Sequence, residues 1–218
     1  MLANRTFTDL LAALASPDPT PGGGSASALA GALAASLLAM VAGMPKTRTG
    51  TPEARAALDA ARAEVLQLQQ RLLELADRDA AAYDAVVAAY RLPKTTEDEK
   101  AARKAEIQRA MQAATDVPLD TMRAAVDLMR RGSVVAAHGN PSAKSDVLVA
   151  MSLAGTAFTG GRANVEINLE GVTDAGWVQA VRREVQDLAL PYATSIRDGY
   201  AALGFTSHFS ADGSTGSR

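Results

Sequence analysis

The longest unbroken helical pattern in the chain places the strongest constraint on its fold. From Glu53 to about Arg91 there is no proline or glycine, and the strong helix formers Ala, Leu, Glu, Gln and Arg dominate the segment. Pro52 suits the first turn of a helix, and Leu92-Pro93 ends the pattern. Apolar residues recur three and four positions apart, so one face of this helix needs a partner. A helix of this length is typical of a helical bundle.

The composition extends this prediction to the whole chain. Of the 218 residues 47 are alanine and only 4% are aromatic, so helix propensity is high almost throughout. Gly31, Ala35 and Ala39, four positions apart, also offer a smooth face for close helix contact. We therefore expect an all-α fold, an up-and-down bundle of long antiparallel helices, as a single domain over residues 1–206. Residues 207–218 are expected to form a flexible tail.

Proline, glycine and polar clusters divide the chain into the other expected helices. These helices span about residues 6–15, 25–43, 96–131, 142–158 and 174–203. Ser25 or Ser27 is the expected N-cap of the second helix, and Thr96 with Glu99 fits a capping box. Pro118 allows a bend within the helix over 96–131.

The segment after residue 158 is less regular. Gly160-Gly161 is expected to interrupt the preceding helix. Val165, Ile167 and Leu169 then alternate with polar residues, which fits a short extended piece or further helix.

Composition and charge exclude several classes of function. Cysteine is absent, and His138 and His208 have no carboxylate near them in sequence, so both are expected to be structural and no metal site is expected. A net charge of -2 offers no field for nucleic acid or anionic lipid. Residues 26–44 are uncharged and long enough to span a membrane, but small residues dominate and no Trp or Tyr marks either end. Since the N-terminus also lacks a basic signal segment, we expect a cytoplasmic protein.

Asp79 interrupts the apolar face of the long helix. The residues of that face are Leu58, Ala61, Val65, Leu68, Leu72, Leu75, Asp79, Tyr83, Val86 and Tyr90. A carboxylate among apolar side chains is partly desolvated, which raises its pKa and suits it to proton transfer. The structural alternative is that Asp79 pairs with an arginine or caps the end of a neighbouring helix.

A glycine-rich turn precedes the second helix, and it is formed by Pro21, Gly22, Gly23, Gly24 and Ser25. Glycine lets the backbone approach a ligand closely, and a helix start presents free N–H groups. No lysine follows the glycines, which argues against a nucleotide-binding P-loop. The structural alternative is a tight turn with a helix cap.

A second polar cluster lies before the apolar helix of residues 147–158. Asn140, Lys144, Ser145 and Asp146 are held there at the edge of the expected core. Asp146 in a first helical turn is also favourable through the helix dipole alone.

Taken together, these motifs resemble the cyclodeaminase and methenyltetrahydrofolate cyclohydrolase family, which includes the C-terminal half of formiminotransferase-cyclodeaminase. The likeness rests on PTPGGGS (19–25), DAAAYDAV (79–86), LPKTTEDEKAAR (92–103), VPL (117–119), GNPSAKSD (139–146) and NVEINL (164–169). Each motif is weak by itself, whereas their order and spacing from about residue 7 to residue 203 are specific.

The resemblance implies an all-helical homodimer that acts on a one-carbon unit bridging two nitrogens of tetrahydrofolate, without metal, nucleotide or another cofactor. Asp79 matches the family's proposed catalytic aspartate, and Asn164 lies in a matching motif and is expected at the substrate. The segment over residues 45–50 departs from the family, because it lacks the aromatic residue that relatives often have there.

The same resemblance assigns parts of a folate to particular side chains. Lys46, Arg48, Lys144 and Arg162 are expected to include the cations that hold the glutamate carboxylates of the tail, including a polyglutamylated one. Asp146 is the expected acceptor for the amino group and ring N–H of the pterin, since one carboxylate can accept both.

Two reactions fit this site, formimidoyltetrahydrofolate cyclodeamination and 5,10-methenyltetrahydrofolate hydrolysis, and the sequence does not choose between them. The alternative from another class is a helical scaffold without catalysis, or a protein that only binds folate. A scaffold explains the alanine-rich helices. It explains neither the aspartate in an apolar face nor the two polar turns that contain glycine.

Overall fold

The computed structural model describes residues 1–204, and these residues form six α-helices and no strand. The helices are α1 (Phe7–Leu14), α2 (Gly23–Ala42), α3 (Pro52–Tyr90), α4 (Glu97–His138), α5 (Lys144–Leu169) and α6 (Ala175–Leu203). Two short 3-10 helices span Leu2–Asn4 and Pro141–Ala143. The all-α prediction is confirmed. His208 and the tail predicted at 207–218 lie outside the described residues.

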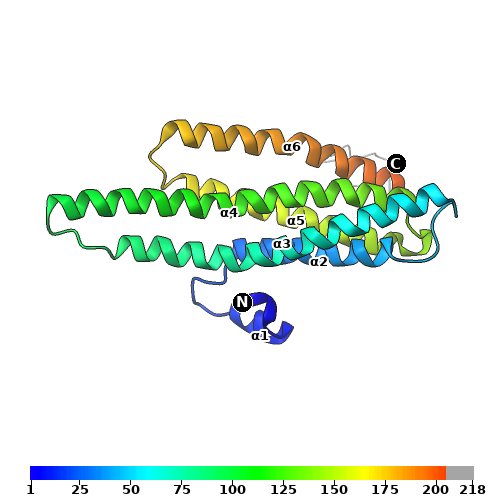
Figure 1. Cartoon of the computed structure of the whole chain (residues 1–218), viewed down its shortest axis with the longest axis horizontal. Coiled ribbons are helices and arrows are strands. Elements are labelled where there is room, and N and C mark those ends of the chain that lie inside the picture. The colour runs from blue at the N-terminus through cyan, green and yellow to red at the C-terminus, as the bar shows by residue number, and fades with distance from the viewer. Residues whose placement is uncertain (205–218) are drawn as a thin grey trace, which may run out of the picture.

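Five of the helices form an up-and-down bundle (Figure 1). Each loop from α2 onward reverses the chain, so consecutive helices run antiparallel. The principal contacts join α4 to α5, α2 to α3, α3 to α4 and α2 to α5, and α6 packs on α4. The α3–α4 hairpin extends beyond the other helices at one end, and α1 lies apart from the bundle (Figure 1).

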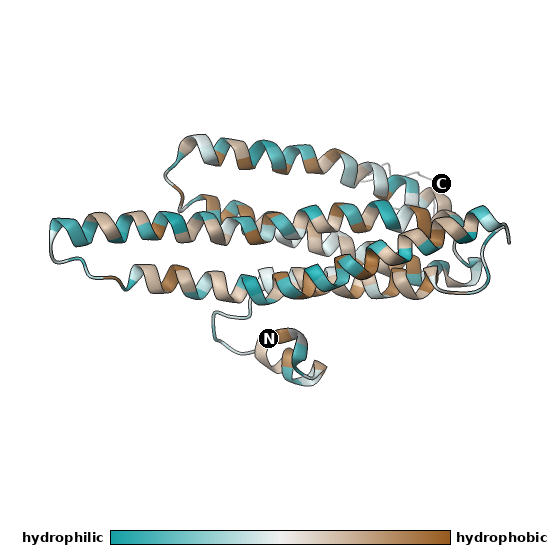
Figure 2. Ribbon diagram, in the orientation of Figure 1, coloured by the Kyte–Doolittle hydropathy of each residue, from teal (hydrophilic) through white to brown (hydrophobic). Residues whose placement is uncertain are grey.

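The core is built from leucines set against small residues. Leu38, Leu58 and Leu72 are fully buried. Brown, hydrophobic positions alternate with teal, hydrophilic ones along the helices of the bundle (Figure 2). A Cβ added at Gly31 of α2 would lie 3.0 Å from Leu72 of α3 and 3.3 Å from Ala157 of α5, so a larger residue would have to push these neighbours away from this close three-helix contact. The smooth face predicted for α2 is therefore confirmed.

Helix α2 is the segment that is long and apolar enough to cross a membrane among the described residues. In its most apolar window 61% of the residues are buried inside the bundle. A helix that is buried to this extent belongs to the core of the bundle, which agrees with the sequence-based argument against a membrane span.

Helix α5 is longer than predicted, because it continues through Gly160-Gly161 to Leu169. A Cβ at Gly161 would lie 3.0 Å from the carbonyl oxygen of Pro118 on α4. The glycine is thus used for close packing rather than to end a helix. The extended alternative for residues 165–169 is wrong, and the helical one is confirmed.

Two other sequence predictions need correction. Helix α2 begins at Gly23 with Gly22 as N-cap, so neither Ser25 nor Ser27 caps it. Tyr83 and Tyr90, placed on the buried face of α3, are 42% and 52% exposed. The reason is that the last turns of α3 extend past the start of α2, so α2 no longer covers them (Figure 1).

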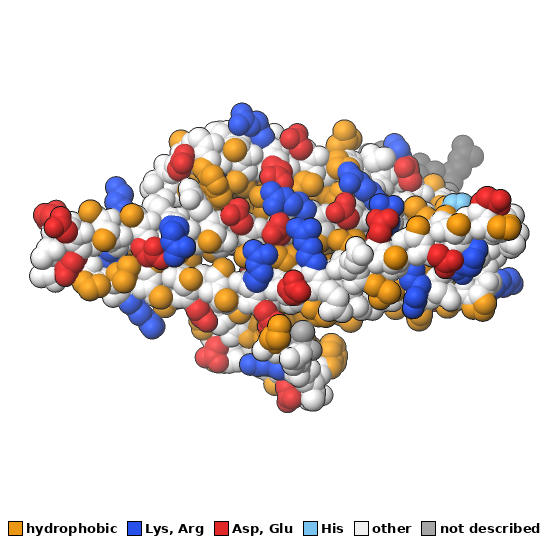
Figure 3. All heavy atoms as spheres, viewed as in Figure 1, with side chains coloured by type: hydrophobic (Ala, Val, Ile, Leu, Met, Phe, Trp, Pro, Cys, Tyr) orange, Lys and Arg blue, Asp and Glu red, His pale blue; other side chains and the backbone are white. Residues whose placement is uncertain are grey.

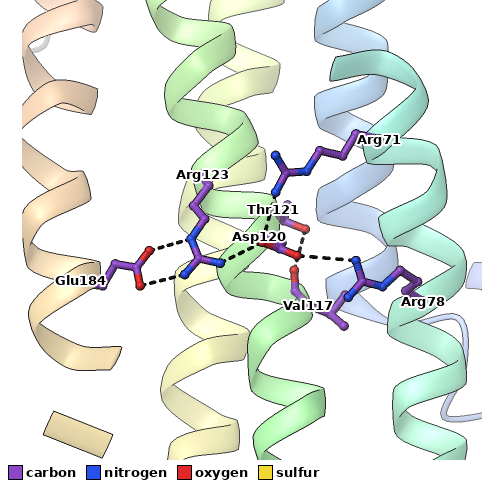
Figure 4. A network of polar contacts seen from close by, with 7 residues as sticks. All are labelled: Arg71, Arg78, Val117, Asp120, Thr121, Arg123 and Glu184. Atoms are coloured by element: carbon purple, nitrogen blue, oxygen red, sulfur yellow. Dashed lines mark hydrogen bonds and ion pairs between the residues drawn. The ribbon is translucent and has the colours of Figure 1, made fainter. Parts of the chain in front are cut away.

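A network of ion pairs holds α3, α4 and α6 together on the surface of the bundle. Figure 3 shows basic and acidic side chains side by side across the middle of this face. Asp120 of α4 accepts from Arg71 at 3.1 Å and Arg123 at 2.8 Å, and it lies 3.5 Å from Arg78 (Figure 4). Arg123 also forms two hydrogen bonds to Glu184 of α6, at 2.6 and 2.8 Å, which raises the pKa of its guanidinium. Because Arg78 precedes Asp79, the network helps to fix the rotation of α3.

Asp120→Asn is expected to lower the free energy of unfolding by about 1–2 kcal/mol, because it leaves three arginines facing a neutral amide. This loss is smaller than the one expected for a fully buried ion pair, because the arginines are partly exposed to solvent. Asp127→Asn, which breaks a single exposed pair to Arg130, should cost less than about 0.5 kcal/mol. Urea denaturation of both variants at low and high salt measures this, and equal losses would contradict a cooperative network.

Candidate active site

Four helices and the glycine turn enclose a cavity of about 320 Å³. Its walls come from the start of α2, the last third of α3, and facing positions of α4 and α5. The lining residues are Pro19, Thr20, Gly22, Gly23, Gly24, Asp79, Tyr83, Val86, Met111, Ala114, Asn164 and Asn168. The cavity therefore brings together three motifs that are widely separated in sequence: the glycine turn, Asp79 and Asn164.

Asp79 lies against the N-terminus of α2. The Ser25 hydroxyl is 2.9 Å from Oδ2 of Asp79, and it is also 3.0 Å from the carbonyl oxygen of Ala76. A Cβ added at Gly24 would come within 2.1 Å of Oδ1 of Asp79. The close approach that glycine permits here is thus to the carboxylate of Asp79.

This contact explains how α2 starts without a side-chain cap of its own. The first N–H groups of a helix need acceptors, and a carboxylate beside them is stabilised by the helix dipole. Asp79 supplies that carboxylate from α3. The structural alternative of a helix cap is therefore correct, and it holds together with the location of Asp79 in a cavity.

Two effects oppose each other on the pKa of Asp79. Burial of the carboxylate raises it, and hydrogen bonds from the Ser25 hydroxyl and the Ser25 backbone lower it; burial dominates, so the pKa lies above its ordinary value. A raised pKa eases proton exchange near neutral pH. This agrees with the sequence interpretation of a desolvated carboxylate.

The two asparagines of α5 present acceptors to the cavity. Asn164 donates its amide to the Gly160 carbonyl at 2.8 Å, and Asn168 donates to the Ala114 carbonyl at 2.9 Å. Ala114 lies four residues before Pro118, which has no N–H to donate within α4. Asn168 replaces that missing donor, and each asparagine keeps its side-chain oxygen as an acceptor.

A second, larger cavity of about 670 Å³ adjoins the first and shares Pro19 and Tyr83 with it. It runs along the outer side of α3 toward the end of the hairpin, and its lining includes Asp84, Val87 and Arg91. Sequence reasoning did not select any of these residues. Tyr83 and Asp84 lie inside the DAAAYDAV motif, which was the available signal, whereas Arg91 was predicted only as the approximate end of the long helix.

The structure does not bring the remaining predicted residues to Asp79. Gly24, at the start of α2, touches Asp79, whereas Val41, near its end, lies against Gly139. Seventeen residues of helix separate Gly24 from Val41, which corresponds to about 25 Å. Six predicted substrate residues lie at that far end: Lys46, Arg48, Asn140, Lys144, Ser145 and Asp146. Within one chain they therefore lie about the length of α2 away from Asp79.

Two of those far residues have structural contacts. Arg48 donates to the carbonyl oxygens of Ala136 and Ala202, at 2.8 and 3.2 Å, and so ties the α2–α3 loop to α4 and α6. Asn140 caps the short helix that follows it by accepting from the Ser142 N–H.

Two further predicted residues lie near the cavity but do not line it. Pro21 sits half-buried in the glycine turn. Arg162 is largely exposed on α5 and lies 3.8 Å from Glu166. Over residues 1–204 no group of three or more His, Cys, Asp or Glu side chains is placed to hold a metal ion.

Comparison with known proteins places this geometry in a family. The formiminotransferase-cyclodeaminase profile matches residues 6–187. The chain is 37% identical over 188 residues to a methenyltetrahydrofolate cyclohydrolase of Methylorubrum extorquens, which covers 86% of this chain and 90% of that protein. It is 30% identical to formimidoyltransferase-cyclodeaminase of Sus scrofa over 86% of its own length but only 35% of the pig protein.

A solved structure of a family member shares the fold of this chain. The formiminotetrahydrofolate cyclodeaminase of Thermotoga maritima superposes with a TM-score of 0.84 at 25% identity, over 94% of this chain and 98% of that one. A continuous family match, a bacterial relative of similar length and a shared bundle agree with one another. The chain therefore belongs to the formiminotransferase-cyclodeaminase family.

Proposed function

We propose that this protein is a folate one-carbon enzyme that acts at the carbon bridging N5 and N10 of tetrahydrofolate. The observation that carries the proposal is Asp79, a desolvated carboxylate in a cavity formed by four helices of a chain from this family. The activity is that of a 5,10-methenyltetrahydrofolate cyclohydrolase or a formimidoyltetrahydrofolate cyclodeaminase. The cyclohydrolase reaction is the first to assay, because the bacterial relative of similar length bears that name.

In the cyclohydrolase reaction water attacks the bridging carbon of the methenyl cation. Ionised Asp79 accepts a proton from that water as the new C–O bond forms. The tetrahedral intermediate then collapses with cleavage of one C–N bond, and the released nitrogen takes up a proton. A carboxylate with a raised pKa suits both steps, since it can accept the proton and return it.

In the cyclodeaminase reaction N10 attacks the formimino carbon and ammonia leaves. Here the protonated carboxyl of Asp79 supplies the proton that the leaving nitrogen requires. Both reactions pass through a tetrahedral carbon at the same place, so one cavity serves either. The chemistry consists of additions and proton transfers, and we propose that it needs no cofactor beyond the folate substrate.

We place the tail of the folate in the second cavity. Arg91 lies twelve residues after Asp79 on α3, an axial distance of about 18 Å, which the length of a folate and an arginine side chain can span. Asp84 lies between them and offers an acceptor for the amide N–H of the tail. Arg91 has no ion pair within residues 1–204, so its guanidinium is available for a carboxylate.

We further propose that the protein is a cytoplasmic homodimer that associates through α1 and α2. Helix α1 buries none of its residues in the described chain. Phe7 and Leu11 of α1 and Leu33 of α2 are 66%, 50% and 50% exposed, around an apolar cavity of about 420 Å³. An exposed apolar patch of this kind is typical of a subunit interface. In such a dimer the far-end residues, such as Asp146, can also come from the second chain.

Asp79→Asn should retain the helical circular dichroism spectrum and folate binding while kcat falls by about a hundredfold or more. In the cyclohydrolase reaction kcat/KM should fall at low pH, because Asp79 becomes protonated. Since the pKa of Asp79 is raised, this acidic limb of the pH profile should lie above the usual pKa of an aspartate. That acidic limb should disappear in the variant. The assay uses both folate substrates with a metal chelator in the buffer, and Asp59→Asn, an exposed aspartate of the same helix, is the control.

These measurements also separate the alternatives. A protein that only binds folate would bind without turnover, and a scaffold would show no spectroscopic titration with a reduced folate. Unchanged turnover in Asp79→Asn would remove Asp79 from the mechanism.

Arg91→Ala is expected to raise KM about threefold to tenfold with little change in kcat, because the interaction holds the tail and not the reacting carbon. The effect should diminish as ionic strength rises. Arg183→Ala, an exposed arginine of α6, should leave KM unchanged. An increase in KM in Lys46→Ala but not in Arg91→Ala would instead support the sequence-based assignment of the tail.

Leu33→Asp should convert the dimer to a monomer, because a charge at the centre of the apolar patch cannot be buried without a partner. Leu190→Asp is the matched control, since Leu190 is 74% exposed on α6, away from the patch. Light scattering after size exclusion measures both masses. A monomeric wild-type protein would contradict the proposed interface.

A further inference from the structure

Ser25 is a buried hydroxyl with two acceptors. Its side chain is 0% exposed, and Oγ lies 2.9 Å from Oδ2 of Asp79 and 3.0 Å from the carbonyl oxygen of Ala76. A serine hydroxyl has one hydrogen to donate, so it can serve only one of these acceptors at a time. A charged acceptor forms the stronger bond, so the hydrogen points to Asp79 when the carboxylate is ionised.

The two oxygens of Asp79 are therefore not equivalent. Oδ2 accepts from the Ser25 hydroxyl, and the Ser25 backbone also forms a hydrogen bond to the carboxylate. Oδ1 lies over Gly24, where the absence of a Cβ leaves it room.

Ser25 can also remain in place when Asp79 is neutral. The Ala76 carbonyl then accepts its hydrogen, and no heavy atom has to move. A buried hydroxyl without an acceptor would cost free energy, so the second acceptor keeps the site stable in both protonation states.

We propose that Ser25 is a positioning residue for Asp79, which fixes Oδ2 and stabilises the ionised carboxylate. The sequence assigned Ser25 to substrate binding; the geometry points to Asp79 as its partner instead. The catalytic meaning of this inference rests on the proposed function, whereas the coupling between the two side chains can be measured without substrate.

No charged group in the described chain competes with Ser25 in setting the charge of Asp79. Tyr83 of α3 is the other titratable side chain that lines the cavity, and the walls from α2, α4 and α5 are glycine, alanine, methionine and asparagine. The neighbours of Asp79 in sequence point elsewhere, since Arg78 pairs with Asp120 and Asp77 accepts from the Leu2 N–H. Burial and Ser25 therefore act on Asp79 in opposite directions with little else involved.

The test compares Ser25→Ala with Ser133→Ala. Ser133 of α4 is a suitable control because its hydroxyl also has two acceptors, the carbonyl oxygens of Met129 and Ser195, but no carboxylate. The pKa of Asp79 is measured in the substrate-free protein from the carboxyl carbon resonances of aspartate labelled with carbon-13. The Asp79 signal is identified by its loss in Asp79→Asn.

Removal of the hydrogen bond should raise the pKa of Asp79 by about one pH unit in Ser25→Ala and leave it unchanged in Ser133→Ala. The acidic limb of kcat/KM should move to higher pH by the same amount. An unchanged pKa in Ser25→Ala, or an equal shift in both variants, would overturn the proposal. Absence of folate turnover in the wild type would overturn the proposed function instead, and the resonance titration would still decide whether Ser25 controls Asp79.

Discussion

The contact between the carboxylate of Asp79 and the N-terminus of α2 organises the site. It requires glycine at position 24, because any side chain there would occupy the space of the carboxylate. It also requires a hydroxyl at position 25, which is buried and holds one oxygen of Asp79. Helix α2 in turn obtains the negative partner that its uncapped start lacks. One interaction thus joins two helices of the bundle around a buried carboxylate, and this burial raises the pKa of Asp79.

The rest of the bundle keeps this contact in place. Leucines of α3 pack on the small residues of α2, which sets how closely the two helices approach. On the opposite side of α3 the ion pairs around Asp120 connect it to α4 and, through Arg123, to α6 (Figure 4). A helix held on both sides has little freedom to rotate. Residue 79 is therefore kept facing the cavity, while its neighbour Arg78 faces the network.

The proline of α4 and the asparagines of α5 complete the opposite wall. Pro118 leaves a carbonyl without its helical donor, and Asn168 supplies one from the neighbouring helix. Close packing at Gly161 makes this exchange possible, since it brings α5 next to α4 at Pro118. The cavity consequently has fixed polar groups on two sides and an extension along α3 that ends at Arg91.

The sequence by itself determined the helical class, most helix boundaries and the desolvated environment of Asp79. These depend on propensity, caps and the spacing of apolar residues along one segment, all of which are local. The tertiary structure decided which polar residues share a site. Gly24 and Asn164 lie at Asp79, whereas Lys46, Arg48 and Asp146 lie about a helix length away, because antiparallel packing places the two ends of α2 at opposite ends of the bundle. The role of Gly160-Gly161 likewise depended on the helix beside it, since a glycine that breaks a free helix can serve close packing inside a bundle.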